Sequence, residues 1–215
     1  MQQEISFDEQ VKINHEEKLF EGKLVIPENS RALIIFADDH GNSLADERNL
    51  AVAVALQNEG FATLQFKMFT DHELSEESHK LDINVLANRI SSAYHWAKTN
   101  PQTEHFNIGL FGFNTGASAA IIVASQSKKN INALVSLSGR PDLVLDELER
   151  IQVPTLLIVG GADNALVTYN QKALPHIRHT ESRINVLQDA GHGFTDKGKL
   201  DQVARLTMDW FVRHI

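Results

Sequence analysis

The residues with the clearest chemical potential lie in Leu110–Ser118, where an apolar run passes directly into a run of small residues. The centre of this segment reads Gly112-Phe113-Asn114-Thr115-Gly116, so two glycines flank Asn114 at equal spacing. Glycines at this spacing permit a tight strand-to-helix turn that holds its central residue at positive φ, above the sheet. The next backbone N–H, at the start of the helix, can donate to a developing oxyanion.

A serine at the centre of this turn would make it a nucleophile elbow, but the sequence has Asn114 there. An amide nitrogen is delocalised and is a poor nucleophile, whereas asparagine tolerates positive φ better than most residues. The turn could therefore keep its shape after losing its chemistry. A dinucleotide-binding loop is disfavoured because Gly109-x-x-Gly112-x-x-x-Gly116 is not G-x-G-x-x-G and no P-loop lysine follows. A plain tight turn remains the other alternative.

An acid and a histidine follow in later loops. Asp163 comes after the apolar run Thr155–Val159, and His192 lies between two glycines after Ile184–Leu187. The chain order of nucleophile position, acid and histidine is that of one class of catalytic triad, in which the acid orients the imidazole. Taken separately, a loop aspartate is more often a helix cap and a lone histidine a surface residue. Their joint placement favours the remnant of a triad at Asn114, Asp163 and His192.

Strand and helix patterns alternate along the chain and would position these loops. An N-terminal antiparallel hairpin is predicted from Val11–Asn14 and Lys18–Pro27. The further strands expected are Ala32–Ala37, Phe61–Phe66, Phe106–Phe111, Ile131–Leu137, Thr155–Val159 and Ile184–Leu187. The helices expected are Asp46–Glu59, Leu81–Thr99, Thr115–Ser125, Ala165–Ile177 and Lys199–His214, with loops at Lys67–Lys80, Ser138–Val153 and Gln188–Gly198. This alternation predicts an α/β fold with a mostly parallel twisted sheet and helices on both faces. Chemistry is then expected in the loops at the carboxyl ends of the strands.

The composition is that of an ordinary globular protein, with 42% hydrophobic and 22% charged residues among 215. We expect one domain, residues 1–215, because no shift in composition marks a second one. A net charge of −8 disfavours nucleic acid as a partner, and no apolar run is long enough to span a membrane. The absence of cysteine excludes disulfides and thiolate nucleophiles. Without a signal-peptide pattern, a cytoplasmic location is expected.

On these motifs the sequence resembles the dienelactone-hydrolase-like branch of the α/β-hydrolases. The stretches that carry the resemblance are Gly109–Ala120, Ser138–Leu143, Pro154–Asp163, Ala190–Ile215, Ala32–Ala37 and Arg48-Asn49. The resemblance covers nearly the whole chain and implies an α/β-hydrolase fold of ester or acyl hydrolase ancestry, without a large cap domain. It also implies that Asn114 stands at the position of the nucleophilic serine.

A second departure from this family's pattern follows the strand Ala32–Ala37. Relatives place His-Gly directly after that strand, where the backbone supplies half of the oxyanion hole. Here Asp38-Asp39 occupy those places, and His40-Gly41 comes two residues later, although a local insertion would restore the pattern. Carboxylates beside a developing oxyanion would oppose its charge rather than stabilise it.

Other side chains are expected near the same pocket. Thr115 follows Asn114, and Phe113 and Phe194, with Met68 and Phe69, could line an apolar site or pack in the core. Three further hydroxyls, none at the centre of the turn, are Ser43, Ser118 and Ser138. The histidine pairs His176-x-x-His179 and His72…His79 lack the H-E-x-x-H arrangement and a clear third ligand, so neither a metal nor a cofactor is predicted.

Three functions remain open on the sequence. The favoured one is a degenerate hydrolase, without ordinary serine-hydrolase turnover, that binds a small uncharged or apolar ligand or a protein partner. The second is an active hydrolase of a small ester or lactone that uses water activated by His192, or a deamidated Asn114. The third is a non-hydrolytic enzyme, such as a lyase or isomerase, with His192 as general base. No pattern indicates an oligomeric state.

Overall fold

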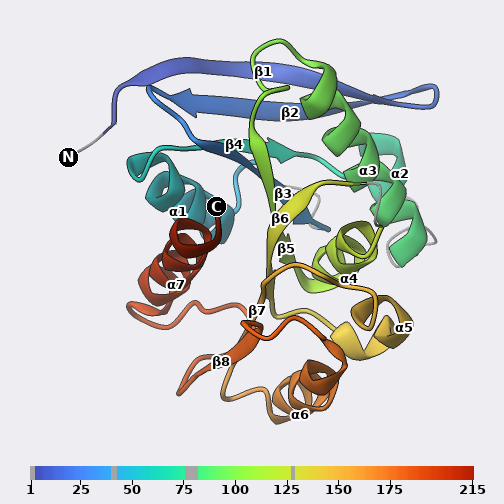
Figure 1. Cartoon of the computed structure of the whole chain (residues 1–215), viewed down its shortest axis with the longest axis vertical. Helices are drawn as coiled ribbons and strands as arrows, with labels where there is room; N and C mark the ends of the chain where they lie inside the picture. The colour runs from blue at the N-terminus through green and yellow to red at the C-terminus, as the bar shows by residue number, and fades with distance from the viewer. Residues whose placement is uncertain (1–2, 40–42, 76–81, 127–128) are drawn as a thin grey trace.

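An eight-stranded sheet forms the centre of the computed structural model, which describes residues 3–39, 43–75, 82–126 and 129–215 (Figure 1). The strands are β1 (Ile5–His15), β2 (Lys18–Pro27), β3 (Ala32–Asp38), β4 (Phe61–Phe66), β5 (Asn107–Phe113), β6 (Ile131–Leu137), β7 (Thr155–Gly160) and β8 (Arg183–Leu187). Their order in the sheet is β1-β2-β4-β3-β5-β6-β7-β8. β2 pairs antiparallel with β1 and with β4, and all later pairs are parallel. The carboxyl ends of β3 and β5 to β8 therefore meet at one edge.

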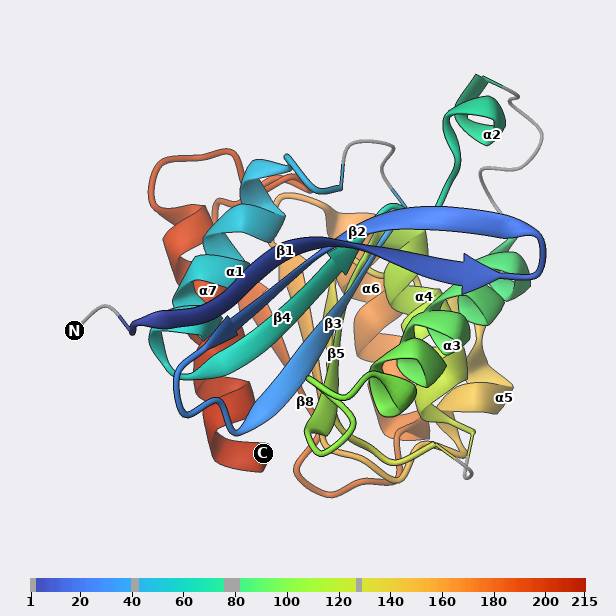
Figure 2. The same cartoon turned by 90° about the horizontal axis from the view of Figure 1, so that it is seen from above.

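Helices cover both faces of the sheet (Figures 1 and 2). They are α1 (Glu47–Asn58), α2 (Asp71–Ser75), α3 (Ile83–Thr99), α4 (Asn114–Ala124), α5 (Leu145–Leu148), α6 (Asn164–Ala173) and α7 (Lys199–His214), with two 3-10 turns, η2 (Pro141–Leu143) and η3 (Leu174–His176). Aspartates accept from backbone N–H groups at the start of α1, α3 and α6, which satisfies donors that the first turn leaves free. α1 packs against α7 on one face, and α3 packs against α4 on the other.

The core is divided by the sheet into two apolar clusters. Alternate residues of β3 show the division, since Leu33 and Ile35 face the α3–α4 side while Ile34 and Phe36 face the α1–α7 side. All seven residues of β3 are buried, as the continuous apolar run predicts for a central parallel strand. The predicted α/β-hydrolase fold, with its N-terminal hairpin and no large cap, is confirmed.

Several predicted boundaries are wrong for identifiable reasons. β1 begins at Ile5 rather than Val11, because it pairs with nearly the whole of β2 while exposing most of its side chains, so its hydrophobic pattern is weak. The expected loop Ser138–Val153 contains η2 and the single turn α5. The last predicted part of α6 is the separate turn η3, where Pro175 removes a backbone donor.

The expected loop Lys67–Lys80 contains α2, which is fixed by an ion-pair network around Glu73. The carboxylate, 5% exposed, lies 2.6 Å from Lys18 Nζ and 2.5 Å from Arg89 Nη2. Arg89, 4% exposed, also donates to the carbonyl of Met68. Burial raises the pKa of Glu73, but hydrogen bonds from Lys18 and Thr70 and the charge of Arg89 outweigh it and lower the pKa to about 2.

Among the described residues, no helix is both long enough and apolar enough to cross a bilayer. The longest of the described helices, α3 and α7, belong to the layers that cover the sheet.

Candidate functional site

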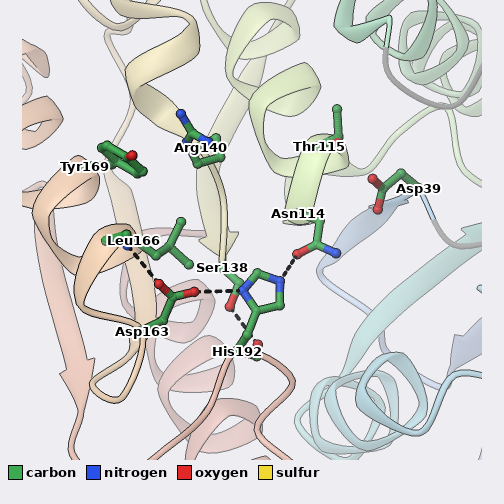
Figure 3. A pocket seen from close by; sticks show the side chains of 10 residues that line it. Asp39, Asn114, Thr115, Ser138, Arg140, Asp163, Leu166, Tyr169 and His192 are labelled. Carbon is green, nitrogen blue, oxygen red and sulfur yellow. Dashed lines mark hydrogen bonds and ion pairs between the residues drawn. The ribbon is translucent and has the colours of Figure 1, made fainter.

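The turn from β5 into α4 has the geometry that its glycines predict. Asn114 has φ 51°, a left-handed conformation that asparagine accepts more readily than most residues, and α4 begins at this residue. A Cβ on Gly116 would lie 2.2 Å from the carbonyl oxygen of Ala37, and one on Gly112 would lie 2.5 Å from the Cα of Ala117. Close backbone packing therefore requires both glycines, and it projects the Asn114 side chain beyond the end of the sheet (Figure 3).

Asp163 and His192 converge on Asn114 from the loops after β7 and β8, as the sequence order predicts (Figure 3). His192 Nε2 lies 2.6 Å from Asn114 Oδ1, and His192 Nδ1 lies 3.3 Å from Asp163 Oδ2. The other oxygen of Asp163 accepts from the N–H of Leu166 at 3.0 Å. Asp163 is thus both the cap of α6 and the partner of the imidazole.

Two arrangements of protons satisfy the contacts of His192. The carboxylate oxygen of Asp163 and the amide oxygen of Asn114 are both acceptors. If both accept from His192, the ring is an imidazolium that donates from both nitrogens. A neutral ring satisfies the same positions if the amide of Asn114 is reversed, with Nδ2–H donating to Nε2 and Nδ1–H donating to Asp163. In both arrangements Nε2 of His192 is engaged by the amide of Asn114.

The His192 loop is fixed at several points. Asp189 and Phe194, which lie in this loop on either side of His192, have φ 56° and 54°. The N–H of Gly191 donates to Asp196 Oδ2 at 3.1 Å, and the hydroxyl of Ser138 donates to the carbonyl oxygen of His192 at 2.9 Å. These bonds hold a side chain that is itself 48% exposed.

The loop after β3 sends its two aspartates to different places. Asp38 is buried and its Oδ2 accepts from Asn49 Nδ2 at 2.6 Å, so the expectation that it lines the pocket is wrong. Asp39 lines the pocket, on the far side of Asn114 from Asp163 (Figure 3). Burial lowers the pKa of Arg48, but hydrogen bonds to Asp46 and the charges of all three aspartates outweigh it and raise the pKa. The predicted His40 lies outside the described residues.

The aromatic residues expected at the pocket wall belong to the core instead. Phe113 is 1% exposed and Phe194 is fully buried, and neither lines the pocket. The centroid of the Phe113 ring lies 6.0 Å from that of His192 and 3.9 Å from the Arg48 guanidinium carbon. Met68 and Phe69 are also buried. Phe113 ends β5 and the other three residues lie in loops, and all four side chains pack in the core. The alternative of core packing is therefore the correct one.

The pocket has a volume of about 580 Å³ and combines polar and apolar walls. Its lining residues are Asp39, Asn114, Thr115, Ser138, Arg140, Asp163, Ala165, Leu166, Tyr169 and His192. Sequence reasoning missed the wall formed by Arg140 and Tyr169, where the guanidinium carbon lies 4.2 Å from the ring centroid. Arg140 also donates to both oxygens of Asp142 at 2.8 and 2.7 Å, and these hydrogen bonds raise its pKa. The spacing Arg-x-Asp after a strand was the available signal.

Two of the three further hydroxyls expected near the pocket, Ser43 and Ser118, have structural partners. Ser43 donates to the carbonyl of Phe66 at 3.1 Å, and Ser118 donates to the carbonyl of Arg140 at 3.0 Å. Across the described parts of the chain, no group of three or more histidine, aspartate and glutamate side chains is placed to hold a metal. His176 instead lies 3.2 Å from Glu149.

Comparisons with known proteins identify the family that the chain resembles over most of its length. The model of the dienelactone hydrolase family matches residues 20–211. Two Mycobacterium tuberculosis proteins, provisionally named phosphoribosyl transferases, are each 40% identical over 194 residues, which are 90% of this chain and 44% of the relative. The chain therefore spans less than half the length of these relatives.

Solved structures resemble the whole chain. The crystal structure of a dienelactone hydrolase from Anabaena variabilis has a TM-score of 0.93 and 35% identity, and the match covers 97% of this chain and 98% of that one. Est1E from Butyrivibrio proteoclasticus has a TM-score of 0.80 at 16% identity, covering 95% and 98% of the two chains. The second likeness concerns the fold alone.

Proposed function

This chain belongs to the dienelactone hydrolase family, and from that premise we propose that its pocket binds a small acyl compound without ordinary serine-hydrolase turnover. Asn114 would occupy the centre of the family's nucleophile elbow, with Asp163 and His192 as the retained acid and base. The proposal is therefore a binding protein of hydrolase ancestry.

The contact between His192 Nε2 and Asn114 Oδ1, at 2.6 Å, carries this proposal. In a triad hydrolase this nitrogen removes the proton of a serine hydroxyl, which then attacks the substrate carbonyl. An amide has no lone pair suited to that attack. Removal of the serine lowers turnover by about 10⁶ in a serine protease, so the same loss here would leave little measurable acyl transfer.

Asp39 supports the same proposal from the other side of Asn114. Acyl transfer develops negative charge on the carbonyl oxygen, which a productive site stabilises with N–H donors. A carboxylate at this wall of the pocket raises the energy of such an oxyanion. The N–H groups that begin α4 can still donate to the carbonyl of a bound, unreacted ligand.

The walls of the pocket favour an uncharged ligand. Ala165, Leu166 and Tyr169 supply apolar surface, while the charge of Arg140 is met by the two-point pair with Asp142. A small ester, lactone or amide would place its carbonyl near Asn114 and its apolar part against Leu166 and Tyr169. Affinity would then come mainly from buried apolar area.

Water activation by His192 is the second candidate. It is favoured by one observation, namely that the imidazole is 48% exposed and retains Asp163 at 3.3 Å. A water could then reach the ring from solvent, but it would have to displace the amide of Asn114 from Nε2. A measurable rate in the native protein that is lost in His192→Ala would favour this candidate.

The deciding experiment compares four proteins on a short p-nitrophenyl ester: the native chain, Asn114→Ser, His192→Ala and the double variant. We expect the native rate to equal that of His192→Ala. Asn114→Ser should exceed the double variant by at least about 100-fold, since a positioned general base contributes about 10² or more. A native rate that depends on His192 would refute the proposal, and an inactive Asn114→Ser would show that more than the nucleophile is missing.

A further inference from the structure

Ser138 has an unusual backbone conformation at the end of β6. It is a non-glycine residue with φ 47°, its side chain is 1% exposed, and its N–H donates to the carbonyl of Ile158 at 2.9 Å. A left-handed conformation costs a side-chain-bearing residue about 1–2 kcal/mol. Such strain persists only where the surroundings determine it, and it is common at functional sites.

The hydroxyl of Ser138 donates to the main-chain carbonyl of His192 at 2.9 Å (Figure 3). This carbonyl belongs to the residue whose ring joins Asp163 to Asn114. A hydrogen bond to this carbonyl fixes the main chain of His192, from which the side chain extends. It therefore influences which atoms the two ring nitrogens reach.

The two residues after Ser138 are tied to the other elements of the site. The carbonyl of Gly139 accepts from Asn170 Nδ2, in α6, at 3.0 Å. The carbonyl of Arg140 accepts from the hydroxyl of Ser118, in α4, at 3.0 Å. Since α6 follows Asp163 and α4 begins at Asn114, residues 138–140 contact all three elements that carry the site.

The His192 loop makes contacts besides the hydrogen bond from Ser138. The N–H of Ala162 donates to the carbonyl of Ala190 at 3.0 Å, and Gly191 is bonded to Asp196. The side chain of Phe194, a residue of the same loop, is fully buried. These contacts do not involve the hydroxyl of Ser138. We therefore expect its loss to change the position of the His192 ring rather than the stability of the loop.

We propose that Ser138 is a positioning residue for His192, which its hydroxyl holds in line with Asp163 and Asn114. The inference deepens the proposed function, because it concerns the histidine of the same site. Ser138 itself touches no reacting atom, and its effect is transmitted through the main chain of His192.

Two substitutions separate the hydroxyl from the backbone. Ser138→Gly removes the hydroxyl and also the energetic cost of the positive φ, which glycine adopts freely. Ser138→Ala removes the hydroxyl but keeps that cost. Ser125→Ala is the matched control, since Ser125 also donates to a main-chain carbonyl, that of Ile122 at 2.8 Å, but lies at the end of α4 away from the pocket.

The first readout is the ring of His192 in otherwise native protein, followed by long-range ¹H–¹⁵N NMR correlation. Both Ser138 variants should change the ring ¹⁵N shifts of His192 while Ser125→Ala leaves them as in the native chain. The second readout is ester hydrolysis in the Asn114→Ser background. There, both variants should lower kcat by about 10- to 100-fold, as loss of an orienting partner does, with KM unchanged.

The NMR comparison remains valid if Asn114→Ser proves inactive, so failure of the proposed function is distinguishable from failure of this inference. Native ring shifts in both Ser138 variants would overturn the inference. Native shifts in Ser138→Gly with altered shifts in Ser138→Ala would also overturn it, because the backbone conformation and not the hydroxyl would then position the ring.

Discussion

Replacement of Glu73 by glutamine should make the stability of this protein much less dependent on acid. The carboxylate is buried, and its contacts with Lys18 and Arg89 favour the charged form. A pKa of about 2 in the folded chain lies well below the ordinary value of 4.5, so the folded state binds the proton more weakly than the unfolded state. The stabilisation is therefore complete above pH 4.5 and is lost as the pH falls toward 2.

The size of this effect follows from the two pKa values. A change from 4.5 to about 2 corresponds to about 3 kcal/mol of stability at neutral pH, of which about 2 kcal/mol is lost by pH 3. In Glu73→Gln, Arg89 loses its charged partner while buried, which costs about 3–5 kcal/mol when one partner of a buried pair is removed. The free energy from the pKa of Glu73 and the cost of leaving Arg89 without its partner describe the same interaction, and the two values are of the same order.

Urea unfolding of the native chain and Glu73→Gln at several pH values between 7 and 3 measures the effect. The native chain should be more stable at pH 7, and the difference should narrow by about 2 kcal/mol at pH 3. Glu21→Gln is the control, because Glu21 also pairs with a lysine, Lys67 at 2.8 Å, but is largely exposed. A difference between native and Glu73→Gln that stays constant with pH would refute the reasoning.

Three further outcomes are expected. Gly116→Ala should lower the unfolding temperature by several degrees and abolish ligand binding, because the added Cβ would lie 2.2 Å from the carbonyl oxygen of Ala37. Gly193→Ala is the control and should unfold like the native chain, since no atom lies closer than 3.6 Å to its added Cβ. Burial lowers the pKa of His214, so stability should decline as the pH falls below 6.5, and His214→Phe should reduce that decline in thermal unfolding at pH 7.5 and 5.5. Mass spectrometry of the tryptic peptide that contains Asn114 should show no deamidation, since this residue begins a helix, and a deamidated peptide would contradict that reasoning.

The alternation of patterns along the chain was sufficient for the architecture. β3, β6 and β7 are rich in apolar residues because both of their faces are covered, and that pattern can be recognised from neighbouring residues in the sequence. β1 and α2 were harder. β1 exposes most of its residues, and α2 depends on the ion pairs of Glu73 with Lys18 and Arg89, which are distant in the sequence.

The candidate site likewise combines features that the sequence predicts and features that it does not. The glycines around Asn114 and those around His192 are local signals for turns, and the chain order placed Asp163 between them. The directions of Asp38 and Asp39 were not readable, because adjacent side chains at the end of a strand point to opposite sides. Only the packing of α1 sends Asp38 to Asn49 and leaves Asp39 at the pocket.

The sequence by itself determined the buried strands of the sheet, the strained turn at Asn114 and the loops that supply Asp163 and His192, since each depends on residues close together along the chain. The tertiary structure alone decided that His192 reaches Asn114 at 2.6 Å, that Arg140 lies over Tyr169 and that the hydroxyl of Ser138 donates to the carbonyl of His192, 54 residues away. These contacts depend on the relative positions of separate elements, which are set by how two apolar clusters pack against the sheet and not by any local pattern.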